Sequence, residues 1–91
     1  MEVGRVIGNV WATKKDENLN GHKLLVIKIL LDKDHEREGF IVATDIVGAG
    51  VGDLVLVSRG GGARQAVGNA KAPIDSAIVG IVDSIEVLDY E

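Results

Sequence analysis

The sequence predicts an all-β fold, a small five-stranded β-barrel that carries one short helix. Three observations support this prediction. The chain has 13 Val and 9 Ile but only three aromatic residues, and β-branched side chains pack well on pleated strands. It has 12 Gly and a single Pro, which suits tight turns between short strands. Apolar runs of strand length alternate with turn residues along the chain.

The chain is long enough for one domain, residues 1–91, and a domain of this size buries only roughly 60 to 65% of its unfolded surface. With 46% hydrophobic residues, 26% charged residues and a net charge of −4, its composition is that of an ordinary folded, soluble domain. Cysteine is absent, which excludes disulfides, zinc–thiolate sites and cysteine nucleophiles. We expect neither a secretory signal nor a membrane span, because the required basic and long apolar segments are missing.

The first two strands are predicted at residues 3–12 and 23–31. Two glycines interrupt the first strand, at places where a barrel strand bends or another backbone approaches. The charged connection contains Asn20-Gly21, which predicts a two-residue hairpin turn with positive φ at both residues. Alternate positions of the second strand are all apolar, which predicts one buried face. They are Leu25, Ile27, Ile29 and Leu31.

The third and fourth strands are predicted at residues 40–44 and 54–58. A loop of alternating acids and bases, residues 32–39, leads into the third strand. The connection between the two strands, residues 45–53, has glycines at alternate positions, which we interpret as turn and packing glycines. They are Gly48, Gly50 and Gly52.

Residues 60–67 are the only stretch that could begin a helix, and this helix would be short. The last strand is predicted within residues 74–87. Residues 54–57 and 77–82 are apolar at odd and even positions alike, so both faces of these strands require burial. Because a barrel has only one interior, the outer face must be covered by the helix, by a partner or by another copy of the chain.

Residue patterns for catalysis or metal binding are not found. His22 and His35 lack the i, i+4 spacing of a helical metal pair and are interpreted as solvated loop residues. Residues 32–38 resemble a calcium loop, but Arg37 and Ala43 occupy the positions that require Gly and a bidentate carboxylate. No serine has a recognisable histidine and acid; the serines are Ser58, Ser76 and Ser84. We therefore expect no enzyme activity, no metal and no cofactor.

Nucleic acid is not an expected partner either. The glycine-rich loops lack the spacing and the following Lys-Ser or Lys-Thr of a phosphate loop. OB-like barrels that bind single strands need a basic groove and aromatic platforms. This chain has 10 Lys and Arg against 14 Asp and Glu, and three aromatic residues in all. An OB-like binding module for single-stranded nucleic acid or another polymer stays as an alternative function, and an accessory subunit of an enzyme complex as a third.

An ordered set of motifs gives the chain a closer resemblance. The glycine-rich and apolar segments in its second half closely resemble the bacterial microcompartment vertex proteins of the EutN/CcmL type; these segments are residues 43–57, 60–65, 73–75 and 78–83. Residues 6–13 and 23–26 are similar to the first two strands of that family, so the resemblance covers essentially the whole chain. The family often has Gly-Ser-Ser-Ala-Arg where this chain has Gly-Gly-Gly-Ala-Arg, at residues 60–64.

The resemblance implies a structural, non-enzymatic function. Proteins of this type form cyclic pentamers of a small barrel at the vertices of a polyhedral shell, which lies in the bacterial cytoplasm. Hexameric shell proteins tile the facets, so the implied partners are four further copies of the chain and these hexamers, with no membrane. A head-to-tail ring would also explain the apolar residues on both strand faces, because each subunit presents different patches to its two neighbours.

In such a ring one small-residue loop is expected to lie near the fivefold axis and to border a narrow pore. Five copies of the loop would converge there, and only small side chains let backbones approach closely. The loop residues are Gly60, Gly61, Gly62 and Ala63. Arg64 is then expected to anchor the loop or to face a neighbour, with Asp75 or Asp83 as its acceptor. An ordinary surface arginine is the alternative for Arg64.

Overall fold

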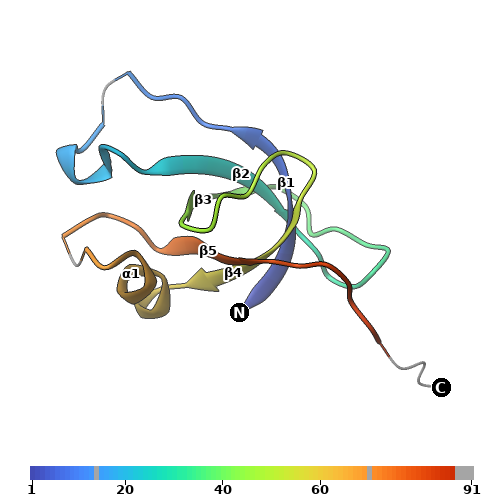
Figure 1. Ribbon diagram of the computed structural model, residues 1–91. Coiled ribbons are helices and arrows are strands. Elements are labelled where there is room, and N and C mark those ends of the chain that lie inside the picture. The colour runs from blue at the N-terminus through green and yellow to red at the C-terminus, as the bar shows by residue number, and fades with distance from the viewer. Residues whose placement is uncertain (14, 70, 88–91) are drawn as a thin grey trace.

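The computed structural model describes all residues except 14, 70 and 88–91, and it is a closed five-stranded barrel (Figure 1). The strands are β1 (Glu2–Asn9), β2 (Lys23–Ile29), β3 (Ile41–Asp45), β4 (Leu54–Arg59) and β5 (Ser76–Ile81). A short 3₁₀ helix, η1 (Glu17–Leu19), lies between β1 and β2, and the helix α1 (Gly61–Val67) lies between β4 and β5. The predicted fold class, a small five-stranded barrel with one short helix, is confirmed.

The order of strands around the barrel is β1-β2-β3-β5-β4. β1 pairs along both of its edges, with β2 on one side and β4 on the other, and all neighbours are antiparallel except β3 and β5. The parallel seam between β3 and β5 is short. Its residue pairs are Thr44 with Ala77 and Asp45 with Ile78. The pairing of β4 with β1 closes the ring of strands.

Gly4 allows β1 to curve closely over β2. A Cβ at Gly4 would clash with Cγ2 of Ile27 and would lie 3.0 Å from the carbonyl oxygen of Lys28. The prediction that a glycine in this strand marks a close backbone approach is therefore right for Gly4. The second glycine, Gly8, has more room, because the nearest atoms to its Cβ would be 3.8 Å away, and it follows a register shift after Val6.

Aliphatic side chains from all five strands fill the barrel interior. The buried cluster consists of Val6, Leu25, Ile27, Ile29, Ala43, Ala49, Val55, Val57 and Ile78. The predicted alternation in β2 is confirmed for Leu25, Ile27 and Ile29, which are buried. It is wrong for Leu31, which is exposed because β2 ends at Ile29 and the chain turns away.

The predicted ends of the first and last strands are also wrong. β1 ends at Asn9 instead of residue 12, and the last strand is shorter than residues 74–87. β5 ends at Ile81 because β4, its partner, begins at Leu54. The N–H of Val82 still donates to the carbonyl of Leu54 over 2.8 Å, and the following residues leave the barrel as a tail (Figure 1).

Asn20 and Gly21 form a turn, but its type differs from the prediction. Asn20 has φ −62° and ψ 135°, and only Gly21 has a positive φ, 83°. The N–H of His22 donates to the carbonyl of Leu19 over 3.1 Å. These values are those of a type II turn, which needs positive φ at its third residue only. Since η1 precedes this turn, β1 and β2 are joined by a long loop instead of a tight hairpin.

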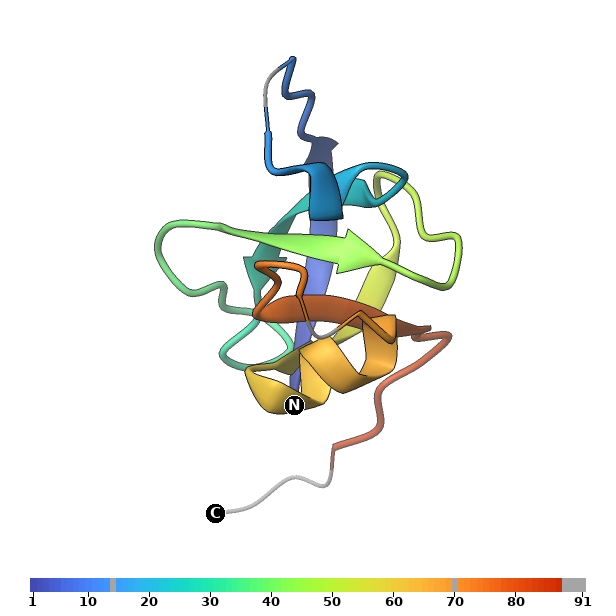
Figure 2. The same ribbon diagram turned by 90° about the vertical axis from the view of Figure 1, so that its left-hand side faces the viewer.

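α1 packs on β5 and β4 at one side of the barrel (Figure 2). Ala63 is its buried residue, and most of its other side chains are exposed. The helix ends at Gly68, which has φ 78° and ψ 13°, in the left-handed region. The N–H of Gly68 donates to the carbonyls of Arg64 and Gln65 over 3.1 and 3.2 Å. Gly68 thus provides a hydrogen-bond donor for carbonyl groups in the last turn of the helix.

We expect Gly68→Ala to lower the free energy of unfolding by about 1 kcal/mol, because a residue with a Cβ is strained at this positive φ. Gly50→Ala is the control, at a glycine whose φ is not positive. A Cβ at Gly50 would meet only Oδ2 of Asp53, at 4.0 Å, so no comparable loss is expected there. Urea denaturation of both variants measures the difference, and equal stabilities would contradict the role given to Gly68.

Candidate functional site

The candidate axis loop, residues 60–63, consists of Gly60, which follows β4, and the first three residues of α1. Gly60 has φ 63° and ψ −135°, a backbone conformation that is open mainly to glycine. Its N–H donates to the carbonyl of Asp75 over 2.7 Å. This bond connects the loop to the segment that precedes β5. Both β4 and β5 therefore fix the position of the loop.

The remaining residues of the loop differ in the space around them. A Cβ at Gly62 would lie 2.9 Å from Oγ of Ser58, so a small residue here allows α1 to pack closely against β4. Ala63 is fully buried under the helix. A Cβ at Gly61, in contrast, would meet no atom within 4 Å, and the φ of Gly61 is not in the left-handed region. Neither a positive φ nor a close contact thus explains a glycine at Gly61.

Arg64 lies exposed on α1. Its guanidinium makes no hydrogen bond or ion pair with any of the residues that the structure describes. The predicted acceptors, Asp75 and Asp83, are also exposed and lie unbonded to it. The predicted pairing therefore does not form within one subunit. Pairing of Arg64 with a carboxylate of a neighbouring subunit stays a prediction.

The loop between β3 and β4 is tied to the barrel. Two of its three glycines have positive φ, 85° and 95°; they are Gly48 and Gly52. Gly50 instead bonds within the loop, because its N–H donates to Oδ2 of Asp53 over 2.8 Å and its carbonyl accepts the N–H of Asp53 over 3.0 Å. Lys23 and Arg5 donate to loop carbonyls over 2.6 and 2.9 Å. These glycines shape a fixed connection.

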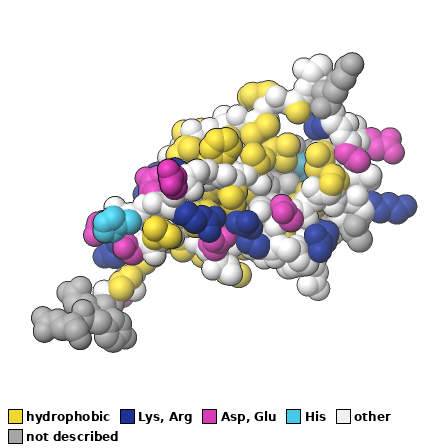
Figure 3. Space-filling view, turned by 180° about the vertical axis from the view of Figure 1, so that it is seen from behind, with side chains coloured by type: hydrophobic (Ala, Val, Ile, Leu, Met, Phe, Trp, Pro, Cys, Tyr) yellow, Lys and Arg dark blue, Asp and Glu magenta, His cyan; other side chains and the backbone are white. Residues whose placement is uncertain are grey.

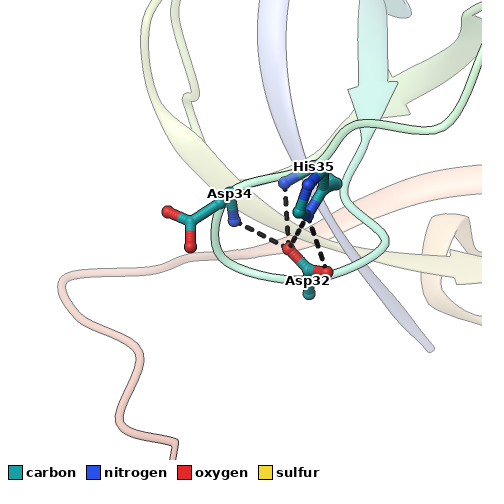
Figure 4. A network of polar contacts seen from close by, with 3 residues as sticks. All are labelled: Asp32, Asp34 and His35. Atoms are coloured by element: carbon teal, nitrogen blue, oxygen red, sulfur yellow. Dashed lines mark hydrogen bonds and ion pairs between the residues drawn. The ribbon is translucent and has the colours of Figure 1, made fainter.

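A polar network closes the loop after β2 (Figure 4). Oδ1 of Asp32 accepts the N–H groups of Asp34 and His35 over 2.8 and 2.9 Å, and Nδ1 of His35 lies 2.8 and 2.9 Å from the two carboxylate oxygens. The hydrogen bond from the Asp34 backbone, followed by that from the His35 side chain, lowers the pKa of Asp32 below its ordinary 3.8. The hydrogen bond with Asp32 raises the pKa of His35 above its ordinary 6.5.

We expect Asp32→Asn to lower the pKa of His35, because the variant removes the carboxylate that stabilises the imidazolium. The raised pKa of His35 and the lowered pKa of Asp32 mean that their contact stabilises the folded loop fully between about pH 3.8 and pH 6.5. This stabilisation is lost as the pH rises through the folded-state pKa of His35, and also as the pH falls through the folded-state pKa of Asp32. NMR titration of the imidazole protons measures the shift. Asp34→Asn is the control, and an equal fall in both variants would contradict this assignment.

Glu2 makes a bridge that the sequence analysis missed. Its Oε2 accepts from Arg37 over 3.0 Å and its Oε1 accepts from Arg59 over 2.9 Å. The bridge joins the start of β1, the loop after β2 and the end of β4. No local pattern could reveal it, because the partners lie 35 and 57 residues from Glu2 in the sequence.

The described residues form no recognisable metal site or serine–histidine catalytic arrangement. They include no group of three His, Cys, Asp or Glu side chains that could hold a metal ion. Neither of the helices in this part of the chain is long and apolar enough to cross a membrane. Ser76 is buried, and its hydroxyl donates to the neighbouring Asp75 over 3.5 Å, with no histidine in the contact.

Large apolar side chains gather on the surface of the subunit (Figure 3). Exposed ones include Ile7, Trp11, Leu31, Phe40, Val42, Ile46, Val47, Val51, Ile81 and Val87. Trp11, the single tryptophan, is 91% exposed in the loop after β1. Exposed apolar area on this scale is typical of a subunit that is covered in an assembly.

The family model described as "Ethanolamine utilisation protein EutN/carboxysome" matches residues 1–83. The chain belongs to the EutN/CcmL family. The resemblance in its motifs is thereby confirmed. The match includes every strand and α1, and so it covers the candidate axis loop as well as the loop after β2.

Members of the EutN/CcmL family with known roles align along nearly the whole chain. The carboxysome shell vertex protein CcmL of Synechocystis sp. is 44% identical over 96% of this chain and 87% of its own length. The bacterial microcompartment shell vertex protein GrpN of Rhodospirillum rubrum is 46% identical over 98% of this chain and 100% of its own. The solved structure of GrpN, described as a pentameric microcompartment shell protein, superposes with a TM-score of 0.85 at 44% identity, over 98% of this chain and 100% of that one.

Proposed function

We propose that this protein is a shell vertex protein of a bacterial microcompartment, a structural subunit without enzyme activity that forms pentamers. The observation that carries the proposal is the full-length similarity to GrpN in both sequence and structure. A carboxysome vertex protein is similar over nearly the same length. A subunit with a small core and many exposed apolar side chains also suits a role that consists of assembly.

The proposed partners are hexameric shell proteins that tile the facets, and the proposed location is the shell of a microcompartment in the bacterial cytoplasm. A sheet of hexagonal units lies flat. Fivefold units at the corners introduce the curvature that closes such a sheet into a polyhedron. A pentamer placed there must contact hexamers along its outer rim, so the subunit needs separate surfaces for its neighbours in the ring and for the facets.

The candidate axis loop is proposed to surround the fivefold axis. The open space around Gly61 supports this placement, because nothing in its own subunit requires a glycine there. Five converging loops would restrict that position to the smallest side chain. The guanidinium of Arg64, which pairs with none of the described residues, is proposed to pair across the interface with a neighbour's carboxylate.

An OB-like module for single-stranded nucleic acid is not favoured. Trp11 comes shortly after Asn9, the last residue of β1, which pairs with Leu25 near the start of β2. Phe40 comes just before Ile41, which pairs with Ile27 near the end of β2. The two aromatic residues therefore lie near different ends of β2. Acidic residues also outnumber basic ones by 14 to 10. Both features are unsuited to a stacking platform in a basic groove.

Size-exclusion chromatography with light scattering tests the proposal. The expected particle has five times the 9.6 kDa mass of the subunit. A monomer that binds a single-stranded oligonucleotide in a salt-sensitive manner would overturn the proposal and would favour the binding module. A stoichiometric complex with an enzyme, recovered in a pull-down, would favour the accessory-subunit hypothesis.

A further inference from the structure

We propose that the side of the subunit opposite α1 is the surface by which the pentamer docks onto the edge of a hexameric facet protein. We call it the rim surface and define it by three exposed apolar residues, Met1, Leu31 and Val87, together with the loop of residues 32–38. This inference rests on the proposed function, because only a vertex pentamer has an outer rim that meets facets.

The position of the rim surface follows from the shape of the barrel. Figure 1 shows α1 on one side of the barrel, and the loop after β2 and the C-terminal tail on the other side. The candidate axis loop begins α1. If five such loops converge on the axis, the side opposite α1 points outward from the ring. The rim surface therefore faces whatever surrounds the pentamer.

The rim surface contains an apolar groove. Its exposed apolar residues are Met1 at 82%, Leu31 at 66% and Val87 at 57%. Half-buried aliphatic residues line the same groove; they are Val3, Leu30 and Ile85. Three segments that are distant in sequence, namely the start of β1, the end of β2 and the tail, thus contribute to one apolar area. Such an area is suited to burial under a partner.

The charge beside the groove indicates the chemistry of the partner. The loop of residues 32–38 carries four carboxylates against two cations, Lys33 and Arg37. Arg37 is paired with Glu2 over 3.0 Å, and His35 lies 2.8 Å from Asp32. Three carboxylates of the loop, Asp34, Glu36 and Glu38, thus make no ion pair with any residue that the structure describes. The partner edge should therefore present apolar side chains flanked by Lys or Arg, since complementary charge steers association and fixes orientation.

The rim surface is ordered before it binds. The N–H of Leu31 donates to the carbonyl of His35 over 2.8 Å, and the N–H of Arg37 donates to the carbonyl of Ile29 over 2.7 Å. The carboxylate of Asp32 accepts two more backbone N–H groups inside the loop (Figure 4). These bonds place Leu31 and the acidic side chains in one arrangement. A surface ordered in this way loses little conformational entropy when it docks.

Binding of pentamer variants to the immobilised hexameric facet protein of the same shell tests the inference, with biolayer interferometry as the readout. Leu31→Asp and Val87→Asp are expected to weaken binding by about tenfold or more, because each puts a charge into the apolar contact. Asp34→Lys is expected to slow association and to reduce its salt dependence. Val51→Asp is the matched control, since Val51 is 62% exposed against 66% for Leu31 but lies in the loop between β3 and β4.

Light scattering on each variant separates the two levels of the proposal. If the variants are pentamers and only the rim substitutions weaken binding, the rim surface is supported. If the wild-type pentamer binds the facet protein and the rim variants bind equally well, the rim surface is wrong while the proposed function stands. If the wild-type chain forms no pentamer, or its pentamer does not bind the facet protein, the proposed function fails and the rim surface fails with it.

Discussion

A Gly61→Phe variant is expected to fold as a subunit and to lose the pentamer entirely. Within its own chain, a Cβ at Gly61 meets no atom within 4 Å, and the backbone there is compatible with any residue. The barrel should therefore keep its stability. In the proposed ring, five phenylalanines would have to share the space around the axis, and the overlap could be relieved only by separating the subunits. Native mass spectrometry measures the pentamer and the monomer directly.

Glu38→Phe is the control for this experiment. It adds the same side chain at an exposed position in the loop after β2, on the other side of the barrel from α1. It should leave the pentamer intact. An unchanged pentamer in Gly61→Phe would count against the placement of the candidate axis loop. A similar loss of pentamer in both variants would show that an added aromatic side chain is harmful wherever it is exposed.

Ile27→Ala is expected to have the largest effect on the stability of the subunit, about 2 to 5 kcal/mol of unfolding free energy. Ile27 is fully buried in the barrel interior, and its Cγ2 fills the space beside Gly4, where a Cβ would clash with it. Because the backbone of β1 is tied to β2 and β4, the barrel cannot collapse into the space that the variant leaves. In a domain of this size each 1 kcal/mol lowers Tm by roughly 4 to 8 °C.

Val26→Ala provides the comparison, because Val26 adjoins Ile27 in β2 but points outward and is only half-buried. Its loss should be clearly smaller. Both variants are best measured by urea denaturation at a fixed protein concentration, since assembly makes the apparent stability concentration-dependent. If Val26→Ala cost as much as Ile27→Ala, the outer face of β2 would contribute as much to stability as the interior.

Local patterns predicted the parts of this fold that depend on local physics. The alternation of apolar residues in β2 identified Leu25, Ile27 and Ile29 as buried, because side chains of a strand alternate between its faces. The helix predicted within residues 60–67 is found at Gly61–Val67, whereas the 3₁₀ helix η1 was not predicted. The assignment to vertex proteins depended on resemblance, because neither composition nor spacing specifies a fivefold ring.

Other features depend on contacts between distant residues and were not predictable. Glu2 bridges arginines from two different parts of the chain, and nothing around it in the sequence marks this role. Leu31 continues the apolar alternation of β2, yet it is exposed, because the turn after Ile29 depends on backbone bonds to His35 and Arg37. The Asn20-Gly21 turn differs in type from the predicted one, because η1 precedes it and lengthens the connection between β1 and β2.

The short parallel seam has a consequence for the motions of the barrel. Only two residue pairs join β3 to β5, whereas five join β3 to β2, and the paired strands of the seam are more than 30 residues apart in the chain. Weakly bonded regions open first in the native state. Amide hydrogens along the β5-facing edge of β3 should therefore exchange with solvent faster than those between β1 and β2. The barrel is expected to open first along this edge.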